Sequence, residues 1–236
     1  MTKRYLHLFF CLFLTHIALG QALKVTPDFP TAEGEITLTF DLAQAKDSRK
    51  AALLNQASGL YLWAWGGADP ANKTAEFSPP GQSSFAQPYA PGVLTRVSDN
   101  VWSIKLTPTK YLTVAAGKTL RWMGFLVKNA NGSAQTEDFL IDLFAPNQLF
   151  VQFTAPTEEN FFVESNTSFP VKAKASATAK LTITLDGNVV ATATDTAVAA
   201  TILVGNTANQ RRTVRVTATA NNRDVTDEFT FTVSPT

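Results

Sequence analysis

Apolar and polar residues alternate with a period of two along most of the chain after residue 20, which is the pattern of half-buried β-strands. In residues 35–41 (EITLTFD), for example, Ile36, Leu38 and Phe40 share one face. This pattern predicts strands, first at 35–41, 60–66, 101–106, 119–127 and 136–142, and later at 149–153, 169–175, 179–185, 189–194, 198–204, 213–220 and 225–233. The fold class expected from it is all-β.

Two segments interrupt the alternation in the first half of the chain. Residues 42–56 have a helix-friendly composition and predict a short helix. Residues 66–92 are rich in Pro, Gly, Ser and Asn and predict a long loop that follows directly on the strand at 60–66. Loops of this length are usually functional or disordered.

The composition changes near residues 145–147 (Ala-Pro-Asn), which we interpret as a linker between two domains. The first domain is expected at 22–145. The second, at 148–236, is rich in Thr, Ala and Val and contains no Trp. Its predicted strands, about seven in about 85 residues, are typical of an immunoglobulin-like (Ig-like) sandwich. The chain is therefore expected to hold two tandem β-sandwiches.

The first 20 residues have the layout of a secretory signal peptide. Lys3 and Arg4 precede an apolar run at 6–19, and Ala18-Leu19-Gly20 supplies a small-x-small cleavage pattern, so we expect cleavage after Gly20. The run is shorter than the about 20 residues of a membrane span. We expect a protein that is secreted or held at the cell surface without a transmembrane segment; a retained anchor is the alternative.

The segment after Gly20 contains no cysteine and no histidine, because Cys11, His7 and His16 all precede that point. This composition argues against cysteine nucleophiles, Ser-His-Asp triads and Cys/His zinc sites. Adjacent carboxylates such as Glu137/Asp138 would point to opposite faces of a strand and could not act together as a glycosidase pair. Without a basic stripe, nucleic acid is not an expected partner. We expect no enzyme activity and no cofactor.

The segment 60–66 (LYLWAWG) is the sharpest candidate for a binding site. Tyr61, Trp63 and Trp65 share one face, and the aliphatic residues Leu60, Leu62 and Ala64 share the other. If the aliphatic face is buried, the aromatic rings form a platform on which sugar rings can stack. In the alternative interpretation the aromatic rings are core and the leucines lie under the 66–92 loop.

Aromatic residues elsewhere have less specific signals. Tyr89 and Phe85, in the long loop, would form one wall of a binding groove or would simply hold the loop in place. Trp102 shares its face with Ile104 and Leu106, and Trp122 lies in a strand that is apolar on both faces; both predict core positions.

Several motifs resemble the N-terminal accessory modules of secreted alpha-amylase-superfamily glycoside hydrolases of Bacteroidetes. In the first domain these motifs are 26–41, 59–65, 100–109 and 126–133 with Glu137-Asp138; in the second they are 181–188 and 227–233. The resemblance implies a carbohydrate-binding-module-like sandwich followed by an Ig-like one. In that family a catalytic barrel follows, and this sequence ends at Thr236 before any such segment.

These observations together favour a non-catalytic, exported glycan-binding protein, in which the first domain binds a starch-like or other glycan and the second is a spacer. The site residues expected are Tyr61, Trp63, Trp65 and Tyr89. The partners expected for this protein are a polysaccharide or surface glycan, together with a glycoside hydrolase or other surface proteins. The alternatives are a structural or adhesion protein of tandem Ig-like domains, and the N-terminal part of a truncated amylase-like hydrolase.

Overall fold

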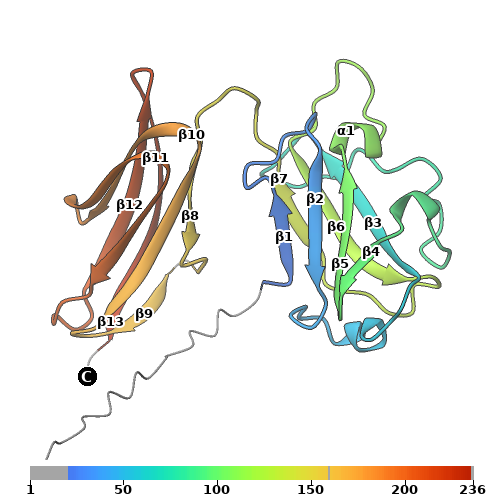
Figure 1. Cartoon of the computed structure of the whole chain (residues 1–236), viewed down its shortest axis with the longest axis horizontal. Coiled ribbons are helices and arrows are strands. Elements are labelled where there is room, and N and C mark those ends of the chain that lie inside the picture. Colours follow the sequence, from blue (N-terminus) through green and yellow to red (C-terminus); the bar gives the residue numbers. More distant parts are fainter. Residues whose placement is uncertain (1–20, 159, 235–236) are drawn as a thin grey trace, which may run out of the picture.

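A computed structural model describes residues 21–158 and 160–234, which form two β-sandwiches (Figure 1). The regular structure is almost entirely β, so the predicted fold class is confirmed. The signal peptide and its cleavage site lie outside the described residues. Within the described ranges, no helix is both long and apolar enough to cross a membrane.

The first sandwich consists of a four-stranded and a three-stranded antiparallel sheet. The four-stranded sheet has the order β1 (Leu23–Thr26), β2 (Ile36–Asp41), β5 (Val101–Leu106), β4 (Thr95–Ser98). The three-stranded sheet has the order β3 (Leu60–Gly67), β6 (Trp122–Asn129), β7 (Phe139–Asp142). Three short helical turns lie between the strands: η1 (Ser48–Leu53), η2 (Ala90–Gly92) and α1 (Pro108–Tyr111). The helix predicted within 42–56 is therefore a single 3-10 segment at 48–53.

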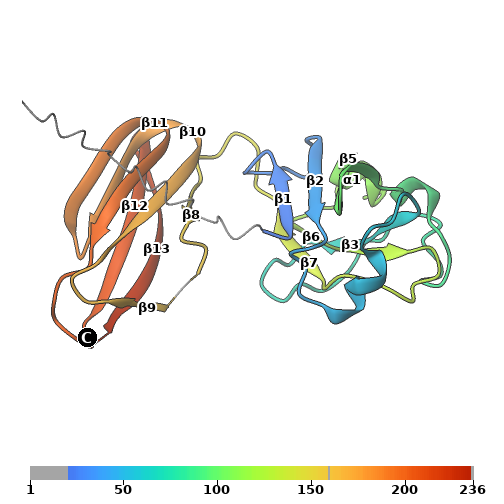
Figure 2. The same cartoon turned by 60° about the horizontal axis from the view of Figure 1, so that its bottom comes forward.

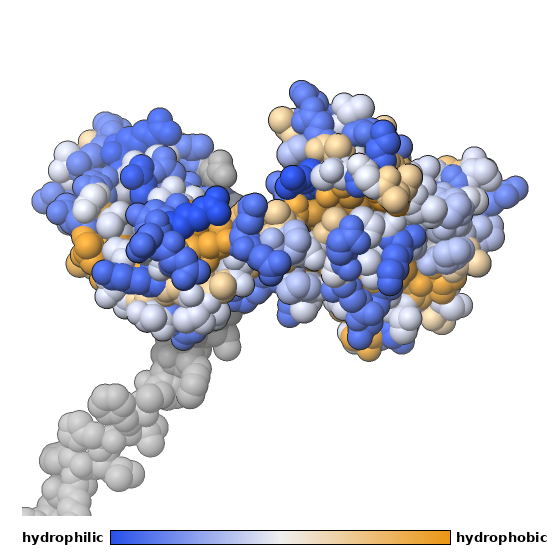
Figure 3. Space-filling model, turned by 90° about the horizontal axis from the view of Figure 1, so that it is seen from above, coloured by the Kyte–Doolittle hydropathy of each residue, from blue (hydrophilic) through white to orange (hydrophobic). Residues whose placement is uncertain are grey.

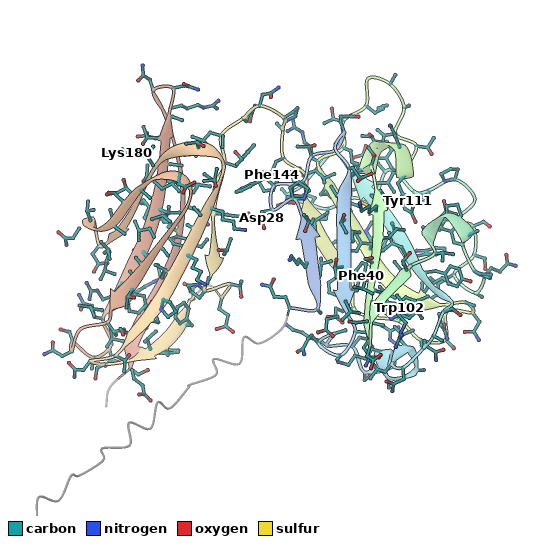
Figure 4. The ribbon with its side chains drawn as sticks, in the orientation of Figure 1. Asp28, Phe40, Trp102, Tyr111, Phe144 and Lys180 are labelled. Atoms are coloured by element: carbon teal, nitrogen blue, oxygen red, sulfur yellow. The ribbon has the colours of Figure 1, made fainter. Side chains whose placement is uncertain are left out.

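The inward faces of the two sheets meet in one hydrophobic core, because alternate residues of each strand point to the same side. Ile36, Leu38 and Phe40 on β2 are fully buried, as the alternation predicts. Phe40 packs edge-on against Phe125 of β6 at 5.8 Å between ring centroids. Trp102, on the neighbouring strand β5, belongs to the same core, as expected (Figure 4).

The second sandwich is built from six strands, of which two are unusually long. The strands are β8 (Val151–Ala155), β9 (Phe161–Glu164), β10 (Ser168–Leu185), β11 (Asn188–Leu203), β12 (Arg211–Ala220) and β13 (Arg223–Ser234). The first half of β10 pairs with β8 and with the end of β11, and its second half pairs with the start of β11 and with β12. This pairing joins two layers through one bent hairpin, as in an Ig-like sandwich (Figure 2).

β10 and β11 each cover two of the predicted strands. The register of the pair shifts between Lys174 and Ala179, but the backbone stays extended through that stretch. This irregularity in the pairing bends the hairpin without ending either strand, so the chain passes from one layer to the other without a loop. The alternation of apolar and polar residues is interrupted at this point, so the sequence predicted two strands where the structure has one.

Three strands were missed by the pattern: β1, β4 and β9. Each has only four residues, which is too short for an alternation to stand out. β9 pairs in parallel with the last strand, β13, a contact that depends on residues about 70 positions away in the chain. These short strands extend the sheets at their edges.

The two sandwiches meet at a small junction around residues 144–150. Asp28 of the first sandwich and Lys174 of β10 form an ion pair at 2.7 Å. Phe144 makes edge-on contacts with Phe29 at 5.2 Å and with Phe150 at 4.8 Å (Figure 4). Beside these contacts lies an open groove of about 870 Å³, and Figure 3 shows the hollow between the two lobes from above.

Candidate functional site

The orientation of β3 decides whether the aromatic residues can meet a ligand. Leu60, Leu62 and Ala64 are completely buried and belong to the core of the first sandwich. Tyr61, Trp63 and Trp65 alternate with them and remain partly exposed on the opposite side of the sheet. The aliphatic face is thus the core face, and the three aromatic residues lie on the outer face of the β3–β6–β7 sheet.

The pairing of β3 with β6 explains how Trp65 lies on this face. Trp65 is directly opposite Gly124, and a Cβ at Gly124 would be 2.5 Å from the Cε2 and Nε1 atoms of the indole. Only a glycine therefore lets the indole lie across β6. On the far side of Gly124, Leu140 of β7 is 50% exposed and extends the apolar surface.

Trp63 is covered in part by a residue of the long loop. Phe85 meets Trp63 edge-on, with 5.1 Å between ring centroids, and both rings stay partly exposed. Opposite Trp63, Leu126 of β6 is almost completely buried. We define the aromatic face as Tyr61, Trp63, Trp65, Phe85 and Leu140.

The long loop runs along the edge of β3 and satisfies its free backbone groups. The Gln82 side chain accepts a hydrogen bond from the Ala64 N–H at 3.0 Å and donates one to the Ala64 carbonyl at 2.8 Å. Phe77 pairs with Gly66, and Val93 pairs with Tyr61. A free strand edge can pair with a strand of another chain. The loop covers this edge of β3, next to the aromatic face, and so prevents such pairing there.

Lys128 of β6 links the long loop to the outer face of the sheet. Its ammonium group is buried and donates to the carbonyls of Gln87, Asn129 and Ala130 at 3.0, 2.9 and 3.2 Å. It also lies 5.6 Å from the centroid of the Tyr61 ring and 5.3 Å from that of Phe85. Burial lowers the pKa of Lys128. Three carbonyl acceptors and two rings compensate for this desolvation, so the position of Phe85 is well fixed.

Tyr89 does not join the aromatic face. It is only 7% exposed, donates a hydrogen bond to the Pro80 carbonyl at 3.2 Å, and packs edge-on against Tyr111. Burial also raises the pKa of Tyr89. Of the two roles considered for this residue, its position matches the one in which it holds the loop in place.

Trp122 is fully buried, as predicted, but not in the central core. It lies on the outer face of β6, where Gly67 is its partner on β3, and the amino group of Lys73 is 5.8 Å from its ring centroid. The 68–76 part of the loop buries it from the solvent side, so it adds no surface to the aromatic face.

Sequence reasoning missed Gly124, Leu140 and Lys128. The signal for Gly124 was present, because a glycine in the middle of an apolar strand often marks the close approach of another group. Leu140 and Lys128 carried no such signal, since their roles depend on which strands become neighbours.

The acidic residues have local structural roles. Glu137 accepts hydrogen bonds from the backbone N–H groups of Lys46 and Asp47 at 2.8 and 3.1 Å. Asp227 accepts one from Phe153 at 2.8 Å. Among the residues that the structure describes, no group of three or more His, Cys, Asp or Glu side chains is placed to hold a metal ion.

No family model and no curated protein matches this chain. Among solved structures, fibronectin(III)-like modules of Clostridium thermocellum CbhA are 17% identical over 36% of this chain and 98% of theirs, with a TM-score of 0.31. The titin Ig tandem A164-A165 is 6% identical over 88% of this chain and 92% of its own, with a TM-score of 0.30. Three N-terminal domains of the bacteriophage RB49 outer capsid protein Hoc are 15% identical over 90% of this chain and 58% of theirs, with a TM-score of 0.28. At these TM-scores the similarities carry no argument, and the assignment of an Ig-like second sandwich follows from its strand pairing.

Proposed function

We propose that this protein is a non-catalytic structural or adhesion protein of the cell exterior, in which two tandem Ig-like sandwiches act through their surfaces. The observation that carries the proposal is the presence of two separate hydrophobic cores joined by a short junction. Such a chain presents two separate surfaces that a short junction keeps close to each other. The exterior location rests on the signal-like sequence of the first 20 residues.

The chemistry of the chain supports a role without catalysis. The segment after residue 20 lacks histidine and cysteine. Glu137 and Asp227, which belong to the paired carboxylates in the sequence, accept hydrogen bonds from backbone N–H groups of neighbouring segments. Groups that are engaged in this way hold the fold together and are not poised for proton transfer.

A bead-adhesion assay tests this proposal. Beads coated with the protein should cluster with one another or attach to a glycan-coated surface, whereas beads coated with heat-unfolded protein should do neither. Folded protein that leaves the beads dispersed and unattached on every surface would overturn the proposal.

A glycan is the second candidate for what the protein binds, and the aromatic face favours it. The Trp65 indole covers Gly124 and remains partly exposed, with Leu140 beyond it and Trp63 beside it on the strand. A sugar presents an apolar C–H face that can stack on such rings, and flat aromatic surfaces are favoured in interfaces of this kind. In this candidate the first sandwich binds a starch-like or other glycan, the second is a spacer, and a glycoside hydrolase is a partner.

Isothermal titration with amylose, maltoheptaose and a panel of other glycans tests the second candidate. We expect Trp65→Ala to weaken binding at least tenfold, a loss of about 1.4 kcal/mol. The matched control is Phe162→Ala, which removes an aromatic ring that is 75% exposed on the second sandwich. Absence of heat with every glycan, or equal loss with both variants, would refute this use of the aromatic face.

A further inference from the structure

β11 forms a long, unprotected edge of the second sandwich. It stands at the end of the strand order and pairs only with β10 along its 16 residues. Within the described part of the chain, its remaining backbone groups make one local bond, from the Thr196 N–H to the Asp195 side chain. Backbone groups exposed in this way are a template for another strand.

The second half of β11, residues 197–203 (AVAATIL), lacks the usual protection of a strand edge. It contains no charged residue, no proline and no glycine, and its register with β10 is uninterrupted from Ala197 to Leu203. Proteins usually protect edges with lysine, proline, bulges or very short strands. The first half differs, because a register shift interrupts it next to Val189.

This edge also presents a projecting side chain and a hollow on the same face. Leu203 is 72% exposed, and Ala197, Ala199 and Thr201 alternate with the buried Val198 and Ile202. A hollow of about 280 Å³ lies beside the alanines, lined by Thr154, Lys172, Ala173, Lys174, Ala197, Val198 and Ala199. Its volume is several times the about 30 Å³ that one water molecule occupies, so it can accept a leucine side chain.

We infer that β11 pairs with β11 of a second copy of this chain, antiparallel and about a two-fold axis at Ala200. This register places Leu203 of each copy opposite Ala197 of the other, so that each leucine meets the hollow of its partner. Thr201 lies opposite Ala199, and Val198 opposite Ile202. A two-fold interface must be self-complementary. This segment meets that requirement, because Leu203 projects at one end and the hollow beside Ala197 lies at the other.

Charge does not oppose this pairing. The lysines nearest the edge, Lys172 and Lys174, lie on β10, one strand behind β11. The lysines of two copies would be separated by three strand spacings, about 14 Å at about 4.8 Å each. This separation exceeds the Debye length of about 10 Å at 0.1 M salt, so the repulsion is largely screened.

The expected dimer is weak. Seven paired residues bury less than the about 1,200–2,000 Å² of a stable complex, which suggests a Kd on the order of 100 µM. Many copies on one surface would add their contacts, and avidity would then make the pairing effective. The inference rests on the adhesion function proposed above and names a second copy of the chain as one partner.

Sedimentation equilibrium of protein expressed from the full sequence tests the pairing, over about 10 µM to about 1 mM. Leu203→Lys should weaken self-association at least tenfold, because it puts a positive charge beside a hollow that Lys172 and Lys174 line. Ala197→Asp alone should also weaken it. An equimolar mixture of the two variants should recover most of the association, because the new lysine of one chain would face the new aspartate of the other. Both positions are exposed, so thermal unfolding should be unchanged.

The control is Val189→Lys, which alters a valine that is 65% exposed on the first half of the same strand. It should associate like the original protein. A protein that stays monomeric throughout, a Leu203→Lys variant that dimerises normally, a mixture that does not recover, or an equal loss with Val189→Lys would each overturn the inference. If beads adhere while the protein is monomeric in solution, the β11 pairing is refuted and the adhesion function stands. If the protein dimerises while beads neither cluster nor attach, the adhesion function alone fails.

Discussion

Truncation of Trp102 should mainly lower stability, whereas truncation of Trp65 should mainly weaken glycan binding. Trp102 is 1% exposed and lies in the core, whereas Trp65 is partly exposed on the aromatic face. We expect Trp102→Ala to lower the free energy of unfolding of the first sandwich strongly. We expect Trp65→Ala to lower that free energy less than Trp102→Ala does and to weaken glycan binding.

The size of the effect follows from the buried area. An aromatic side chain buries about 150–250 Å², which at about 25 cal/mol per Å² is worth about 4–6 kcal/mol. The Nε1 hydrogen of Trp102 has no hydrogen-bond partner among the described residues, and removal of a buried, unpaired donor returns about 1–3 kcal/mol. The net loss is then about 1–5 kcal/mol with a midpoint of about 3 kcal/mol, which overlaps the about 3–5 kcal/mol typical of such truncations. Trp65 keeps more of its surface in water than Trp102 does, so we expect a smaller loss for Trp65→Ala than for Trp102→Ala.

Urea unfolding followed by tryptophan fluorescence measures this difference. All four tryptophans belong to the first sandwich, so the signal reports on that sandwich alone. With a slope of about 2 kcal/mol per M, Trp102→Ala should lower the midpoint by about 0.5–2.5 M, with about 1.5 M at the middle of that range. A shift of less than about 0.5 M for Trp102→Ala, or a shift for Trp65→Ala that is as large as that for Trp102→Ala, would refute the assignment of the two faces.

Three further predictions follow from the same structure. Gly124→Ala should displace the Trp65 indole, destabilise the first sandwich by about 1–3 kcal/mol and weaken glycan binding without removing any aromatic ring; unchanged binding in titration would contradict this. Burial raises the pKa of Tyr111 well above its usual 10.0, so just above pH 10 this side chain ionises in the unfolded chain and stays neutral in the folded one, and its contribution to stability should fall as the pH rises. Tyr111→Phe should remove that part of the fall, and identical alkaline unfolding curves for the two proteins would contradict it. Asp28→Ala should change stability by less than about 1 kcal/mol, because the pair with Lys174 is exposed, but should broaden the distance distribution in small-angle X-ray scattering; an unchanged distribution would show that the ion pair does not hold the junction.

Much of the fold was predictable because strand alternation is a local property. β2 and β5 were located within one residue at each end. The errors arose where a local pattern does not determine pairing. β10 and β11 continue through an irregular stretch that resembles a loop in sequence, and the four-residue strands β1, β4 and β9 exist because longer strands lie beside them.

The candidate site was only half accessible to sequence reasoning. Alternation placed Tyr61, Trp63 and Trp65 on one face, but both faces of that strand are apolar and pattern alone could not orient them. Tyr89 was assigned to the site because loops often carry binding residues, yet its side chain packs on Tyr111 inside the loop. Lys128 gave no hint of its burial, which depends in part on the Gln87 carbonyl, about 40 residues earlier in the chain.

The sequence by itself determined that the chain is all-β and which residues share a side of each strand, because the period of two is imposed by the backbone. Only the tertiary structure decided which side is the core, since that depends on which strands come to face one another. The burial of Leu60, Leu62 and Ala64 against the opposite sheet turns the aromatic rings outward. The pairing of β11 with β10 on one side alone leaves its other edge open.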